Sequence, residues 1–165
     1  LQSACNRTLK RMNRHYTVEY YLEQIEDIVN RFDRPFLGSD IIAGFVGETD
    51  EDFEITVENL KKSKLSQIHT FPYSIRKGTI AEKLDGHLPD KIKEERASVI
   101  KKISADKFKN FVESNIGHEA EVLIEKRPDK SGKFKGVTRN YLTLLLDKGE
   151  FNTLKNVVIT KDMIK

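Results

Sequence analysis

The sequence has a single cysteine, Cys5, no tryptophan and four prolines among its 165 residues. One cysteine excludes an internal disulfide framework, and it excludes a zinc or iron–sulfur centre built only from cysteines of this chain. No segment approaches the roughly eighteen consecutive apolar residues of a membrane span, and residues 1–7 lack the apolar core of a signal peptide. We therefore expect a globular cytoplasmic protein with no membrane partner.

The sequence also lacks the residue spacings of common hydrolytic centres. Its four histidines show no metal-ligand spacing, and no base stands near a serine or near Cys5 in a recognisable nucleophile motif. We therefore expect no metal site and no catalytic residue built by this chain alone.

Three segments carry hydrophobic residues at helical spacing, at 17–32, 49–64 and 89–114. Thr17 and Thr49 begin the first two and are good N-terminal caps. An apolar strand at 36–45, which we expect to be buried on both faces, and a second strand at 67–71 flank the middle helix. Together these three elements have the length of a parallel βαβ unit.

After Gly117 the pattern changes to alternating apolar and polar residues in four or five short segments, separated by turn residues. Short antiparallel strands of this kind are typical of a small β-barrel. The predicted fold class is thus α/β over residues 1–115 followed by an all-β domain over residues 116–165.

Two loops follow the carboxyl ends of the expected parallel strands, where α/β proteins bind ligands. Gly44–Thr49 offers two glycines and Glu48 before a helix N-terminus, and it lacks the known phosphate-binding glycine motifs. It fits either a ligand loop or a tight turn whose glutamate compensates the helix dipole. Phe71–Thr79 offers aromatic rings and Arg76, and it fits either a ligand site or an ordinary loop.

The net charge of +3 is unevenly distributed. Residues 126–139 hold six basic residues and one acidic residue, a local charge of +5, which leaves −2 for all the others. Beside Phe134 and Tyr141, such a cluster fits either an RNA-binding surface or a solvated charged hairpin.

Residues 1–14, 40–49 and 69–79 resemble, in order and spacing, three signatures of the radical S-adenosylmethionine methylthiotransferases. The tail with Gly136–Tyr141 resembles the TRAM module that ends these enzymes and binds RNA. Within the family, Gln2–Cys5 and Arg11–Thr17 most resemble the branch acting on N6-threonylcarbamoyladenosine beside the tRNA anticodon. The branch acting on isopentenyladenosine is the alternative, and a non-catalytic RNA-binding protein with a degenerate half-barrel is another.

The resemblance implies a parent enzyme that adds a methylthio group at C2 of the adenosine, using S-adenosylmethionine and two 4Fe-4S clusters. It implies that this chain is a C-terminal fragment, half of a radical S-adenosylmethionine barrel followed by TRAM, because the cluster cysteines are missing. We expect the fragment alone to be inactive, and its partners to be the missing N-terminal region and the anticodon stem-loop of tRNA. Ala4 stands where the family has glycine, and Val46 and Ile75 where proline is common.

The resemblance also implies site residues. The implied cofactor-binding residues are Gln2, Ser3, Arg14, Gly44, Phe45, Gly47, Glu48, Phe71, Tyr73 and Ser74. The residues we expect to contact RNA are Lys126, Lys133, Lys135, Arg139, Asn140 and Tyr141.

Overall fold

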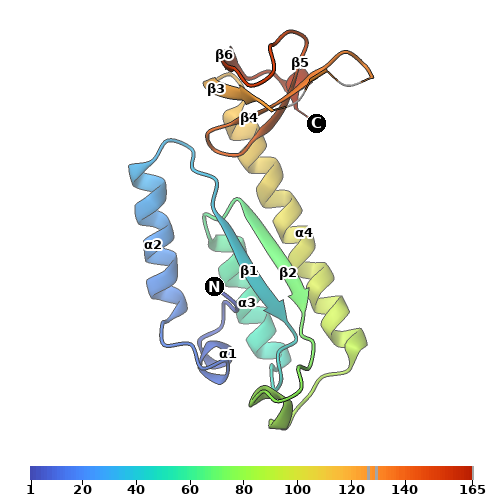
Figure 1. Ribbon diagram of the computed structural model, residues 1–165. Coiled ribbons are helices and arrows are strands. Elements are labelled where there is room, and N and C mark those ends of the chain that lie inside the picture. The colour runs from blue at the N-terminus through green and yellow to red at the C-terminus, as the bar shows by residue number, and fades with distance from the viewer. Residues whose placement is uncertain (126, 129, 165) are drawn as a thin grey trace. The chain divides into compact units, whose positions relative to one another are not determined.

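The computed structural model describes residues 1–125, 127–128 and 130–164, and the chain divides into two compact units (Figure 1). Unit 1 comprises Leu1–Asp33 and Leu37–Phe108, and unit 2 comprises Arg34–Phe36 and Lys109–Lys165. The long helix α4 (Asp90–Asn115) contributes residues to both units. A domain boundary at residue 115 stays a prediction.

Unit 1 contains the expected βαβ unit. Strands β1 (Gly38–Ala43) and β2 (Gln67–Pro72) pair in parallel over their whole lengths, and helix α3 (Asp50–Lys62) connects them. Gln2 forms a further parallel bridge with Ile41 of β1. The carboxyl ends of two strands and the residues after Gln2 therefore meet at one edge of the sheet (Figure 1).

The two strands bury only one of their faces. Ser39, Ile41 and Ala43 are buried, whereas Asp40 between them is exposed and Ile42 is half-buried. The expectation that this strand is buried on both faces is wrong, because successive strand residues point to opposite sides and the helices cover one side. The buried side packs against apolar residues of all four helices, among them Leu9, Val18, Leu60, Ala97 and Ile100.

Helix ends follow the capping residues of the sequence. Helix α2 (Val18–Arg31) begins after Thr17, whose hydroxyl accepts a hydrogen bond from the Tyr20 amide at 3.2 Å. Helix α3 begins after Thr49, which forms a reciprocal capping box with Asp52. Both predicted caps are confirmed. The short helix α1 (Asn6–Arg11) and the 3₁₀ turn Ala81–Lys83 were not expected from the periodicity.

Unit 2 is an antiparallel sheet followed by the 3₁₀ turn Lys161–Met163. The order of its strands is β5 (Thr143–Leu146), β4 (Phe134–Thr138), β3 (Glu119–Ile124) and β6 (Leu154–Val158). An isolated bridge joins Leu144 to Ile164, so the chain after β6 returns to the edge strand β5. The core includes Phe111 of α4 and apolar residues of the sheet. The all-β tail is confirmed, with four strands in the residues of the tail that the structure describes.

None of the helices in the described ranges is long and apolar enough to cross a membrane.

Candidate functional site

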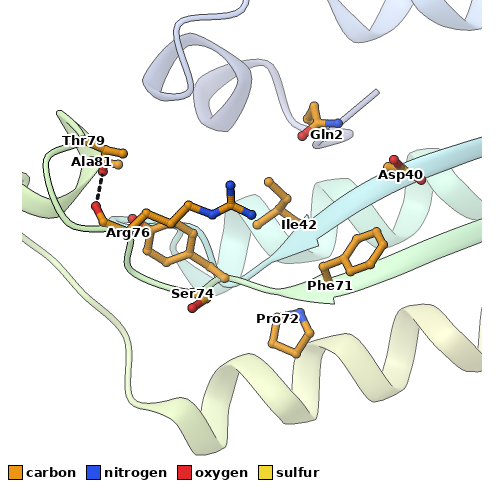
Figure 2. A pocket seen from close by; sticks show the side chains of 10 residues that line it. Gln2, Asp40, Ile42, Phe71, Pro72, Ser74, Arg76, Thr79 and Ala81 are labelled. Atoms are coloured by element: carbon orange, nitrogen blue, oxygen red, sulfur yellow. Dashed lines mark hydrogen bonds between the residues drawn. The ribbon is translucent and has the colours of Figure 1, made fainter.

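A pocket of about 570 Å³ lies on the open side of the parallel strands, toward their carboxyl ends (Figure 2). The strands supply Asp40, Ile42 and Phe71, and the loop after β2 supplies Arg76. The Phe71 side chain is 54% exposed, so an aromatic face is open to a ligand. The full lining is Gln2, Asp40, Ile42, Phe71, Pro72, Tyr73, Ser74, Arg76, Thr79 and Ala81.

A second pocket of about 330 Å³ adjoins the first and shares Gln2, Ile42 and Ala81 with it. It adds Arg14 and Phe45, together with neighbouring residues of segments 11–14 and 80–84. The structure thus brings six of the ten residues proposed for cofactor binding to two connected pockets. These six are Gln2, Arg14, Phe45, Phe71, Tyr73 and Ser74.

Gln2 occupies the wall between the pockets through an unusual backbone conformation. Its φ is +74°, in the left-handed region that non-glycine residues rarely adopt. Two hydrogen bonds to β1 hold it there: its N–H donates to the Asp40 carbonyl at 2.8 Å, and its carbonyl accepts from the Ile42 N–H at 2.9 Å. Such strained residues cluster at ligand sites, where the surrounding structure over-determines them.

The remaining four residues proposed for cofactor binding, Ser3, Gly44, Gly47 and Glu48, line neither of the two pockets. Ser3 is buried, and its hydroxyl accepts from the Cys5 N–H at 3.2 Å. Gly44 and Gly47 have φ of +72° and +75°, which glycine adopts without strain. A side chain at Gly44 would overlap Lys93, so this glycine is required for the close approach of α4.

Glu48 points into the protein rather than into a pocket. One carboxylate oxygen accepts from Arg96 at 2.6 Å and from the Gly44 N–H at 3.0 Å. Burial raises the pKa of Glu48, while Arg96 and the Gly44 N–H act in the opposite direction. The two hydrogen bonds tie the Glu48 side chain to Arg96 and to the first residue of the loop Gly44–Glu48.

Arg96 of α4 organises this loop, although no sequence motif indicates this role. Its guanidinium donates to the Glu48 carboxylate and to the Glu48 carbonyl at 3.1 Å, and it pairs with Asp50 at 2.6 Å. It also lies over the Phe53 ring, 5.2 Å from the centroid. A signal was present, because Arg96 stands four residues from both Ile92 and Ile100 on the apolar stripe of its helix.

Cys5 lies beside Asp52 at the start of α3. Its thiol donates to the Asp52 carboxylate at 3.4 Å, and Arg7 forms an ion pair with the same carboxylate. Burial opposes ionisation of Asp52, but bonds from Thr49 and Cys5 and the charge of Arg7 outweigh it, so its pKa is lowered. Within the described residues, no three histidine, cysteine or acidic side chains form a metal-binding group.

In unit 2, three of the basic side chains expected to contact RNA form ion pairs with carboxylates of the same unit. Lys133 pairs with Asp147 at 2.7 Å, Lys135 with Glu125 at 3.7 Å, and Arg139 with Glu121 at 2.7 Å. These acids lie on or beside neighbouring strands, outside the segment whose charge was counted. The sheet thus places a carboxylate beside each of these three cations.

Asn140 and Tyr141 form the turn between β4 and β5. The Asn140 amide donates to the Arg34 carbonyl and to the Asn115 side chain, both at 2.9 Å, so its role in the structure is to hold this turn. Tyr141 has a φ of +64° and is 77% exposed, which leaves its ring available for stacking. Lys126, the remaining residue expected to contact RNA, lies outside the described residues.

No protein-family model matches the sequence. The chain is 43% identical over 124 residues to threonylcarbamoyladenosine tRNA methylthiotransferase MtaB of Aquifex aeolicus, which covers 75% of this chain and 30% of the relative. It is 38% identical over 168 residues to tRNA-2-methylthio-N(6)-dimethylallyladenosine synthase of Clostridium botulinum, covering 98% of this chain and 36% of the relative. The Bartonella tribocorum protein of the same name is 37% identical over 148 residues, with 89% and 32% covered.

The chain therefore spans about a third of the length of the curated relatives that it matches. The names of these relatives agree with the resemblance carried by segments 1–14, 40–49 and 69–79. The chain belongs to the radical S-adenosylmethionine methylthiotransferase family.

Proposed function

We propose that this chain is part of a tRNA methylthiotransferase that adds a methylthio group at C2 of a modified adenosine next to the anticodon. The observation that carries the proposal is the convergence of the three signature segments. Segments 1–14, 40–49 and 69–79 are distant in sequence, yet each supplies residues to the larger pocket. Relatives at 37–43% identity are named for this type of modification.

The favoured substrate is N6-threonylcarbamoyladenosine. The Aquifex aeolicus relative, at 43% identity, is named for it, and the run Arg11–Thr17 resembles that branch. The second candidate is dimethylallyladenosine, also called isopentenyladenosine. It is favoured by the extent of the match, because the Clostridium botulinum synthase covers 98% of this chain.

The pockets fit S-adenosylmethionine, which would supply the methyl group and the radical chemistry when bound. Arg14 offers an unpaired guanidinium for the methionine carboxylate, and the exposed Phe71 ring offers a surface for adenine. Glu48 and Arg96 hold the loop Gly44–Glu48 beside these groups. We assign no 4Fe-4S cluster to this chain, because Cys5 is buried and bonded to Asp52.

Unit 2 is proposed to be a TRAM module that binds the anticodon stem-loop. The exposed Tyr141 ring can stack on a base, and Arg139, whose side chain is 83% exposed, can reach a phosphate. Lys135 of β4 and Lys133 just before this strand add positive charge. The described part of the tail therefore combines stacking and phosphate neutralisation on one small domain.

The test is nucleoside analysis by mass spectrometry of tRNA from cells in which the gene for this chain is deleted. Loss of the methylthio group from N6-threonylcarbamoyladenosine, restored by the intact gene, is the expected result. Loss from dimethylallyladenosine instead would support the second candidate. Normal methylthiolation of both nucleosides would overturn the proposed function.

A further inference from the structure

Arg76 stands apart from most arginines of unit 1 because its guanidinium is unpaired. Arg7 and Arg96 bind carboxylates, Arg31 pairs with Asp27, and Arg11 donates to two backbone carbonyls. Among the arginines in the described part of unit 1, only Arg14 and Arg76 have side chains that make neither a hydrogen bond nor an ion pair. Arg76 lines the larger pocket, and Arg14 lines the smaller one.

The backbone of Arg76 is fixed although its side chain is free. The Arg76 carbonyl accepts from the Thr79 hydroxyl at 2.8 Å and from the Thr79 N–H at 3.3 Å. Glu82 braces the same turn by accepting from the Gly78 N–H at 2.7 Å. A guanidinium carried on a braced turn is partly preorganised, which lowers the entropic cost of binding an anion.

Figure 2 shows where this guanidinium points: from the loop into the 570 Å³ pocket, toward Ile42. The same pocket contains the exposed Phe71 ring and the carboxylate of Asp40. With the Phe71 ring proposed for the adenine of S-adenosylmethionine and Arg14 for its carboxylate, the fork of donors on Arg76 is left for a second oxyanion. Arg14, which offers the same chemistry, serves the adjoining smaller pocket.

We propose that Arg76 binds a backbone phosphate of the RNA at the larger pocket, beside the S-adenosylmethionine proposed to lie there. This inference rests on the proposed function and deepens it, because it names the contact that positions the RNA on unit 1. Lys77 is the matched control. It is the neighbouring exposed cation on the same loop, but it does not line the pocket.

The test is fluorescence anisotropy of a labelled anticodon stem-loop titrated with the 165-residue chain at several salt concentrations. We expect Arg76→Gln to weaken binding about tenfold, as loss of a charge-assisted bond does, and Lys77→Gln to weaken it about twofold or less. The slope of log affinity against log salt should fall by about 0.7 to 0.9 in Arg76→Gln. Arg76→Lys should recover part of the affinity, because lysine keeps the charge but loses the bidentate geometry.

A second arm identifies the anion. In a set of stem-loops, each has a different single phosphate replaced by a neutral methylphosphonate. At one position the replacement should weaken binding to the original protein but should not weaken binding to the Arg76→Gln variant any further. If Arg76→Gln instead weakens binding of S-adenosylmethionine but not of 5′-methylthioadenosine, which lacks the carboxylate, the anion is the cofactor's and the inference is overturned. Equal effects of Arg76→Gln and Lys77→Gln on RNA would overturn the inference alone. A chain that binds no RNA at all would overturn the proposed function with it.

Discussion

Arg96→Met is the substitution that most directly tests how the loop Gly44–Glu48 is held. The Arg96 and Glu48 side chains are 6% and 2% exposed, and their charged atoms are 2.6 Å apart. Removing one member of a buried pair leaves the other charge uncompensated, which costs about 3–5 kcal/mol of unfolding free energy. The bond to Asp50 contributes little to this figure, because that carboxylate is 95% exposed and screened by water.

The pH dependence of this cost is the distinctive part of the prediction. Burial raises the pKa of Glu48 above its ordinary value of 4.5, so the native state holds the proton more tightly than the unfolded chain does. The stability that Glu48 contributes is then fully present below its ordinary pKa and is lost as the pH rises through the native pKa. Arg96 lowers the pKa of Glu48, so removing Arg96 raises this pKa further and enlarges the stability lost as the pH rises. The destabilisation caused by Arg96→Met should therefore grow from acidic to neutral pH.

Urea denaturation followed by tyrosine fluorescence measures this cost mainly in unit 1. The sequence has no tryptophan, and four of its five tyrosines belong to unit 1, namely Tyr16, Tyr20, Tyr21 and Tyr73. The control is Arg31→Met, which breaks an exposed pair with Asp27 and should cost about 0.5 kcal/mol or less. Adding Glu48→Gln to Arg96→Met should recover stability at neutral pH, because it removes the orphaned charge. Equal costs for Arg96→Met and Arg31→Met, or a cost that does not rise with pH, would refute the reasoning.

Three further substitutions test other contacts. Thr49→Ala removes the N-terminal cap of α3 and should cost about 1 kcal/mol in the same urea assay, whereas Thr49→Ser should be nearly neutral. Gly47→Ala should cost about 1–2 kcal/mol, because φ is +75° there and the new methyl group would meet the Arg11 guanidinium; an unchanged midpoint would contradict this. Glu121→Gln should strengthen binding of the anticodon stem-loop up to about fivefold by releasing Arg139, and weaker binding would argue against a phosphate contact there.

The elements of unit 1 could be predicted because their local signals agree with the tertiary structure. Thr17 and Thr49 cap the helices that they precede, and the apolar stripe of 89–114 became α4. The exposure of one face of β1 could not be predicted from the run Ile41–Ala43, since hydrophobic residues at adjacent positions point to opposite sides of a strand. Which side is covered depends on where the helices pack, and that is a property of the whole unit.

The site was predictable only in part, for a similar reason. Loop position placed Phe71, Tyr73 and Ser74 near a pocket, because carboxyl ends of parallel strands meet at one edge of a sheet. The same argument left Glu48 either in a ligand loop or in a tight turn where it compensates the helix dipole, whereas the structure turns its carboxylate toward Arg96. Arg96 is 48 positions away from Glu48, so the sequence of the loop does not indicate this pairing. The one signal is the position of Arg96 on the apolar stripe of its helix, which indicates a buried partner of opposite charge.

Counting charged residues along the sequence does not show which of them form ion pairs in the folded protein. The local charge of +5 in residues 126–139 suggests a strongly basic surface. In the structure, however, Arg139 pairs with Glu121, Lys135 with Glu125 and Lys133 with Asp147. Phosphates binding there must displace carboxylates, so each tail contact gains only the difference between two ion pairs. At Arg76, whose guanidinium has no ion-pair partner among the described residues, a phosphate has no carboxylate to displace. The affinity gained per phosphate should therefore be larger at the pocket than on the basic tail, although the count of charges along the sequence points to the tail.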